Sequence, residues 1–189
     1  MALHLTADAA ADELLSSNPL ALLIGMLLDQ QVAMESAFTG PLKLARRVGS
    51  VDAATLAGYD PQALVEVFRQ TPAVHRYPGS MAARVQALAT TVMADWGGDA
   101  AAIWTRGDPT GPEALKRLRA LPGYSEMKAK IFLALLGKQC GFDGAGWREA
   151  SDPYGQEGTL RSIADITSPE SLAKVREFKR EMKATARKK

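Results

Sequence analysis

Residues Leu115–Ala129 read LKRLRALPGYSEMKA, and this stretch decides the fold class. Apolar residues at helical spacing on both sides of Pro122 and Gly123 predict two helices joined by a tight turn. A glycine there lets another chain approach the backbone closely, and the second helix opens with N–H groups that have no partner inside the helix. Since the helix dipole adds partial positive charge at the same place, the turn predicts a phosphate-binding corner. The same turn is also a frequent plain connector between helices.

The rest of the chain also favours helices. Alanine and leucine dominate, strict alternation of apolar and polar residues never persists, and glycine or proline punctuates the pattern. We expect an all-α protein without strands, in which a long central helix spans Leu20–Phe38 and Gly40 and Pro41 end it. Further helices are expected at about 80–96, 113–120 and 126–139, and from Ser168 onward. The segment after Cys140 is rich in glycine and proline and predicts irregular structure.

Composition excludes several classes of protein. Of the 189 residues, 47% are hydrophobic and 23% are charged, which is typical of a folded domain and not of a disordered chain. The single Cys140 excludes a disulfide framework and a four-cysteine iron–sulfur cluster. The longest strongly apolar run, Leu20–Leu28, is far shorter than the roughly 20 residues that cross a bilayer. We therefore expect a soluble cytoplasmic protein with no membrane partner.

Positive charge is concentrated at the C-terminal end. The formal net charge of the whole chain is only +2, yet residues 170–189 hold eight lysines and arginines against three glutamates. A basic terminal helix suits a polyanion such as nucleic acid. The alternative is a solvated surface helix whose basic end complements the helix dipole.

Two motifs in a fixed order resemble the helix-hairpin-helix DNA glycosylases. Leu115–Ala129 has the apolar and small residues of the hairpin element, although Ser125 stands where that pattern usually has a second glycine. Asn18–Ala33 (NPLALLIGMLLDQQVA) resembles the helix that opens the core of the endonuclease III and alkyladenine glycosylase group. The resemblance runs from about Asn18 to Gly141, roughly two thirds of the chain.

The resemblance implies an architecture and a function. The chain would form a single domain of two helical lobes: a central lobe at about 20–110, and a second lobe made of residues 1–19 and 111–189, with the hairpin at 115–130. The activity implied is base-excision repair, in which a glycosylase flips a damaged or mispaired base out of double-stranded DNA and hydrolyses its N-glycosidic bond. The protein would then be a monomer associated with the nucleoid.

The resemblance also implies which residues contact DNA. Gln31 stands where the family's side chain fills the gap left by the extruded base, and its amide can hydrogen-bond the orphan partner. Gln30 and Trp147 are expected to line the pocket that receives the base. Contacts to the DNA backbone are expected from the hairpin, at Gly123, Ser125, Lys128 and Lys130.

Hydrolysis requires a carboxylate near the anomeric carbon, to activate water and stabilise the cationic sugar. The family places an aspartate a little over twenty residues past the hairpin glycine. Asp143, twenty residues after Gly123, and Asp152, twenty-nine after it, are the two candidates. Bifunctional members carry a lysine nucleophile at the fourth residue past that glycine, where this chain has Met127, so the expected enzyme is monofunctional.

No cofactor is expected, and no residues show metal-ligand spacing; a monovalent cation at the hairpin is the one ion that the resemblance allows. Two alternatives remain open at this stage. The protein could be a non-catalytic DNA-binding relative that lost the catalytic aspartate. It could also be a helical interaction module with no role on nucleic acid, as its small net charge allows.

Overall fold

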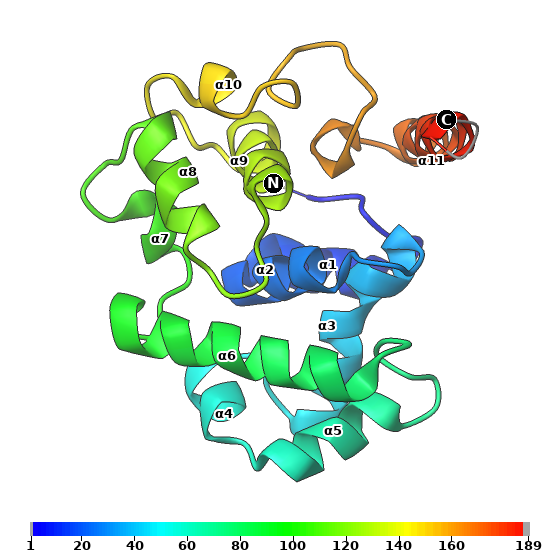
Figure 1. The fold of residues 1–189 in the computed structure, drawn as a ribbon, viewed down its shortest axis with the longest axis vertical. Helices are drawn as coiled ribbons and strands as arrows, with labels where there is room; N and C mark the ends of the chain where they lie inside the picture. Colours follow the sequence, from blue (N-terminus) through cyan, green and yellow to red (C-terminus); the bar gives the residue numbers. More distant parts are fainter. Residues whose placement is uncertain (1, 187–189) are drawn as a thin grey trace.

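The computed structural model describes residues 2–186, which are all-helical and contain no strand. Ten α-helices and one short 3-10 helix precede the last helix (Figure 1). The elements, in chain order, are α1 Ala9–Ser17, α2 Pro19–Leu28, α3 Met34–Val48, α4 Ala53–Gly58, α5 Pro61–Arg69, α6 Pro78–Trp96, α7 Ala102–Thr105, α8 Gly111–Arg119, α9 Glu126–Gln139, α10 Trp147–Ala150, η1 Ile163–Asp165 and α11 Pro169–Ala186. The all-α expectation is therefore confirmed.

Helix α2 forms the centre of the core. Every residue from Leu20 to Leu28 is buried, which explains why this stretch is apolar on all sides. The Asn18 side chain caps the start of α2 by accepting from the Ala21 N–H at 3.0 Å, and Pro19 follows in the first turn. Helices α3 and α6 contact α2, as does α9, so α2 joins the early and late parts of the chain.

The other helices gather on opposite sides of α2. In Figure 1, α4, α5 and α6 lie below α2, while α7 to α11 lie above it. Contacts agree with this grouping, because α4 and α5 pack on α6, whereas α8, α9 and α10 pack on one another. Helix α1 packs against α2 and α3.

The expected long helix over 20–38 is wrong. The chain leaves the helix after Leu28, turns through Asp29–Ala33 and starts α3 at Met34. Helix α3 then continues through Pro41, so Gly40 and Pro41 do not end it either. The absence of a Cβ at Gly40 instead permits a close crossing, since a Cβ there would lie 2.6 Å from the Leu28 Cδ1 atom.

Within residues 2–186, no single helix is long and apolar enough to cross a membrane. Helices α1 and α2 reach the required length and hydropathy only when taken together, and they meet at 117°. The basic residues Arg187, Lys188 and Lys189 of the expected C-terminal tail lie outside the described residues.

Candidate nucleic-acid interface

Helices α8 and α9 form the predicted hairpin. Thr110 and Glu113 cap the start of α8 reciprocally, and the Ser125 hydroxyl caps α9 by accepting from the Lys128 N–H at 3.2 Å. Ser125 has φ −76°, so this position needs no glycine, and the departure from the family's pattern supplies an N-cap instead. Gly123 does take a left-handed φ of +79°.

The corner between the two helices is docked on α2. A Cβ added at Gly123 would lie 3.2 Å from Leu27 Cδ1, so glycine allows a close approach here. The Tyr124 side chain is buried beside it, and its hydroxyl donates to the Leu23 carbonyl at 2.8 Å. Gly123 and Ser125 themselves remain exposed, so the corner packs on α2 with one side and is open to solvent on the other.

Free backbone donors are exposed at this corner. The Tyr124 N–H donates to the Leu121 carbonyl, and the Lys128 N–H is used by the Ser125 cap. Among residues 2–186, no acceptor is found for the N–H groups of Gly123, Ser125, Glu126 and Met127. These four donors lie at the positive end of the 14-residue helix α9, which is the arrangement that binds phosphate oxygens.

Lys128 does not lie at the surface of the hairpin, where a contact to the DNA backbone was expected. Only 9% of its surface is exposed, and its Nζ donates to the carbonyls of Met26 and Leu27, each at 2.7 Å. Burial lowers the pKa of this ammonium to about 8, although the charge of Asp29 opposes the shift. Lys128 therefore caps the C-terminal end of α2 and is turned away from any phosphate at the surface.

Two other cations are available beside the corner. Lys130 is half-buried and Arg119 is exposed, and each lies 3.7 Å from a carboxylate oxygen of Glu126. Ion pairs this long at the surface contribute little, so both side chains can turn to a phosphate at small cost. Lys130 keeps its expected location at the hairpin, and Arg119 is an addition that the sequence motifs did not single out.

The Gln30–Gln31 loop lies next to the hairpin and shares a hydrogen-bond acceptor with it. The Leu27 carbonyl accepts from the Gln30 Nε2 at 2.8 Å and from the Lys128 Nζ at 2.7 Å. Gln31 is exposed and adopts a left-handed φ of +57°, which is uncommon for a residue with a side chain. The structure thus brings Gln30, Gln31 and the hairpin corner together at one end of α2.

Side chains from the segment before α6 hold this loop in place. His75 is buried, with Nε2 3.0 Å from the Gln30 carbonyl, while its Nδ1 accepts from the Tyr77 N–H at 3.1 Å. Since Nδ1 is an acceptor, the proton of the neutral ring belongs on Nε2, which donates to Gln30. Burial lowers the pKa of His75, in keeping with a neutral ring.

Two further contacts come from the same side of the loop. Tyr77 donates its hydroxyl to the Gln31 Oε1 at 3.2 Å, and Arg84 of α6 donates to the Gln30 Oε1 at 2.9 Å. Gln30 is therefore fixed through both its backbone and its side chain. Among the described side chains, Tyr77 alone contacts the Gln31 amide, at 3.2 Å on the surface, so Gln31 is held less firmly than Gln30.

The two expected catalytic aspartates lie elsewhere. Asp143 follows the far end of α9 and lines a hollow of about 200 Å³ with Trp104 and Cys140. Helix α9 has 14 residues and is about 21 Å long at about 1.5 Å per residue, which separates Asp143 from the hairpin corner. Asp152 is exposed beyond α10 and accepts from the Gln156 side chain at 2.9 Å. Neither aspartate is brought to the corner.

Trp147 also lies away from the corner. Its ring packs on α9 at Gly137, where an added Cβ would come within 2.4 Å of the ring, and the Arg148 guanidinium lies 4.5 Å from its centre. This position fits a packing role at the outer end of the hairpin and provides no wall for a pocket near Gln31.

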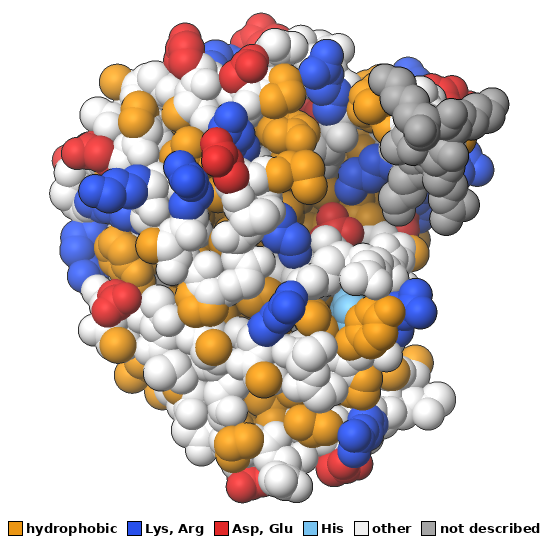
Figure 2. All heavy atoms as spheres, in the orientation of Figure 1, with side chains coloured by type: hydrophobic (Ala, Val, Ile, Leu, Met, Phe, Trp, Pro, Cys, Tyr) orange, Lys and Arg blue, Asp and Glu red, His pale blue; other side chains and the backbone are white. Residues whose placement is uncertain are grey.

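A groove that the sequence motifs did not indicate runs between the loop after α2 and helix α11. It encloses about 450 Å³, with Asp29, Val32 and Met34 on one side and basic residues of α11 on the other. In Figure 2, acidic and basic side chains gather in the hollow beside α11. Asp29 directly precedes Gln30 and Gln31 in the sequence, and that adjacency was the one available signal.

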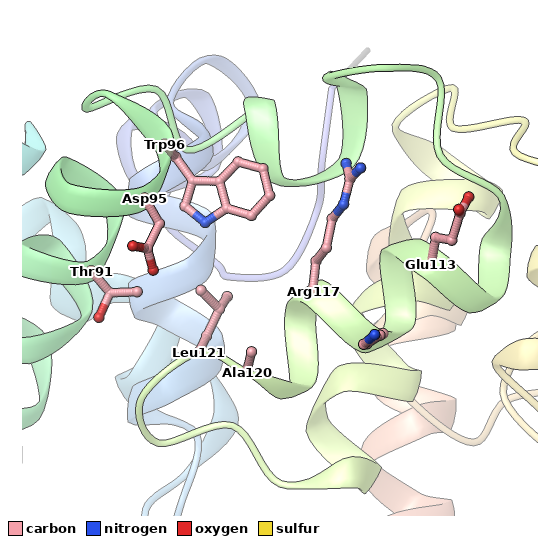
Figure 3. A pocket seen from close by; sticks show the side chains of 8 residues that line it. Thr91, Asp95, Trp96, Glu113, Arg117, Ala120 and Leu121 are labelled. Carbon is pink, nitrogen blue, oxygen red and sulfur yellow. The ribbon is translucent and has the colours of Figure 1, made fainter.

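A second hollow, of about 390 Å³, lies between α6 and α8 next to the hairpin corner. Figure 3 shows Trp96 of α6 facing Arg117 of α8 across it, with Leu121 beneath them. The Arg117 and Arg106 guanidinium groups lie 5.4 and 5.5 Å from the Trp96 ring centre, so both stack on this indole. The side chains fix the junction of α6 and α8.

Comparison with known proteins adds no family to this description. No protein-family model matches the chain, and no curated protein matches it in sequence. Within residues 2–186, no cluster of three or more histidine, cysteine or carboxylate side chains could hold a metal ion. Any assignment of function must therefore rest on the motifs and on the geometry of the corner.

Proposed function

We propose that this protein binds double-stranded DNA at a damaged or mispaired base and acts as a monofunctional base-excision glycosylase. The hairpin corner would hold the sugar-phosphate backbone, and Gln31 would fill the space left by the extruded base. The observation that carries the proposal is the shared Leu27 carbonyl, which fixes the Gln30–Gln31 loop beside the corner. A backbone grip and a wedge must lie on one face if they are to act on one nucleotide.

Residues around the corner support a hydrolytic reaction. Met127, at the fourth position past Gly123, is 58% exposed and carries no nucleophile. The amine of Lys128 is buried and donates to two carbonyls, so it is not free to attack a sugar. Water is then the remaining nucleophile. A monovalent cation at the hairpin stays a prediction of the family resemblance.

The alternative is DNA binding without catalysis. It is favoured by the placement of Asp143 and Asp152 away from the corner, at the outer end of the hairpin. Both readings share the same DNA-binding face, so binding is the first property to test.

We expect tighter binding to a duplex with an abasic-site analogue than to the intact duplex, because the extruded position is already empty. Gln31→Ala should lose about fivefold to tenfold of that preference, on the order of one hydrogen bond, or about 1 kcal/mol. Gln62→Ala, an exposed glutamine on α5, is the matched control and should bind as the unaltered protein does. Fluorescence anisotropy at several salt concentrations measures both quantities.

Affinity should fall steeply with salt, since phosphate contacts release counterions. Salt-independent binding, or no binding at low salt, would exclude a nucleic-acid role. An unchanged preference in Gln31→Ala would remove the wedge from the proposal.

A further inference from the structure

Asp29 is the carboxylate nearest to the Gln30–Gln31 loop along the chain, and it faces a groove. Its side chain is 18% exposed and lines the 450 Å³ space between this loop and α11. Among the side chains that the structure describes, none donates a hydrogen bond to its carboxylate, and Lys179 forms an ion pair with it at 3.7 Å from Nζ. A largely enclosed carboxylate without a hydrogen bond is an acceptor available to a ligand.

Two lysines lie close enough to Asp29 to interact with its charge. The buried Lys128 ammonium interacts electrostatically with it from beneath, and Lys179 of α11 approaches from across the groove. The Lys179 side chain is one-third exposed, and its Nζ also contacts the Met34 sulfur. Because the two groups are 3.7 Å apart, beyond hydrogen-bond distance, Lys179 can leave Asp29 at little cost when a ligand enters.

The walls of the groove suit a flat heterocycle bearing polar edges. Val32 and Met34 supply apolar surface, while Asp29 supplies an acceptor. Arg176 of α11 forms an ion pair with Glu35, so Lys179 and Arg180 supply the further positive charge of this wall. A volume of about 450 Å³ lies within the roughly 300–1,000 Å³ of small-ligand sites.

We propose that the extruded nucleotide enters this groove and that Asp29 is the carboxylate that catalyses hydrolysis of its N-glycosidic bond. This inference rests on the proposed function. The water oxygen forms a bond to the anomeric carbon while the bond from that carbon to the base nitrogen breaks, and its electron pair leaves with the base. Asp29 stabilises the cationic sugar and accepts one proton of the water. A neutral base takes a proton from solvent on its departing nitrogen, whereas a cationic alkylated base leaves as a neutral molecule without one; Asp29 returns its own proton to solvent.

Asp29 lies on the same side of the molecule as the hairpin corner, where the reaction requires a carboxylate. Asp29 directly precedes the loop that shares the Leu27 carbonyl with the hairpin, whereas Asp143 lies beyond the opposite end of α9. The base class also follows from the walls. The Asp29 carboxylate favours a base that presents amino or ring N–H donors, or positive charge, as alkylated purines do.

The test is single-turnover excision on duplexes carrying uracil, hypoxanthine, 3-methyladenine, 8-oxoguanine or an adenine mispair, with strand breaks revealed by alkali. We expect excision of at least one of these bases. Asp29→Asn should slow it by about 100-fold or more, the range of general acid–base catalysis. Asp95→Asn, an exposed aspartate on α6, is the matched control and should excise at the unaltered rate.

Binding to the abasic-analogue duplex is measured in parallel, with Asp29→Ser as a second variant and thermal unfolding as a check on folding. Retained binding with lost excision in either folded variant supports the assignment. Full activity in Asp29→Asn overturns it, as does loss of excision in Asp143→Asn or Asp152→Asn alone. If the unaltered protein binds but excises nothing, the Asp29 role fails and DNA binding stands; if it does not bind, both fall.

Discussion

His75 illustrates how a single residue far along the chain controls the candidate site. It holds the Gln30 carbonyl with one ring nitrogen and the Tyr77 N–H with the other. A protonated ring would place a second donor against the Tyr77 N–H, which breaks this arrangement. The Gln30–Gln31 loop therefore depends on a neutral histidine.

Stability should consequently decrease in mild acid. Burial lowers the pKa of His75 in the folded state below its ordinary value of 6.5, so the unfolded chain binds this proton first as the pH falls. The free energy of unfolding should decline as the pH drops below about 6.5, with a slope of at most about 1.4 kcal/mol per pH unit from this group. Above that pH, His75 contributes no slope.

Urea unfolding at pH 5.5 and pH 7.5 measures the effect. His75→Gln removes the titrating ring and should reduce the difference between the two pH values. His4→Gln changes the only other histidine, which is exposed, and is the matched control. Equal differences in the two variants would show that His75 does not carry the pH dependence.

At the scale of elements, the α8–α9 hairpin was predictable because its signals are local. Thr110, Pro112 and Ser125 mark the helix starts, and the expected range 126–139 agrees with α9. The end of α2 was not predictable in this way. Its last carbonyls accept from Lys128, about 100 residues away, and the turn that follows accepts from His75. No stretch of neighbouring sequence around Leu28 contains those donors, which come from Lys128 and His75.

Gly123 carries a prediction for the hairpin element. Gly123→Ala places a Cβ in a left-handed backbone and against Leu27, so it should cost about 1 kcal/mol or more of stability. Gly49→Ala is the matched control, because Gly49 also has a positive φ but has open space around it. Both variants should lose stability by thermal unfolding.

Only Gly123→Ala should also lose affinity for the abasic-analogue duplex, since only this glycine lies at the corner. If both variants bind the duplex as tightly as the unaltered protein, the DNA contact lies elsewhere. If both lose a similar amount of affinity, the effect comes from reduced stability alone.

For the whole molecule, the spacing of the motifs predicted the elements of the candidate site better than it predicted the catalytic carboxylate. Gln31 and Gly123 lie near the same end of α2 because α2 and α9 pack against each other, and both motifs lie at the ends of those helices. Asp143 fits the family's spacing better than Asp152 does, yet its distance from the corner depends on the direction in which α9 carries the chain. The groove at Asp29 depends on α11, which returns to the α2 end from a remote part of the sequence.

The same packing makes the proposed DNA binding compatible with a small net charge. Positive charge need only surround the face that contacts phosphate, and Arg119, Lys130, Arg84 and α11 lie around the hairpin and the Gln30–Gln31 loop. The carboxylates on this face, Glu126, Asp29 and Glu35, each lie beside one of these cations or a cation of α11. Local arrangement of charge is thus a better guide to the partner than the sum over the chain.

Amide chemical shifts, recorded by ¹H–¹⁵N NMR while the abasic-analogue duplex is added, test the proposed DNA-binding face most directly. We expect the amides of Gly123, Ser125, Glu126 and Gln31 to shift together along one binding curve, while those of α4 and α5 stay unchanged. Shifts confined to other helices, with these four amides unaffected at low salt, would contradict it.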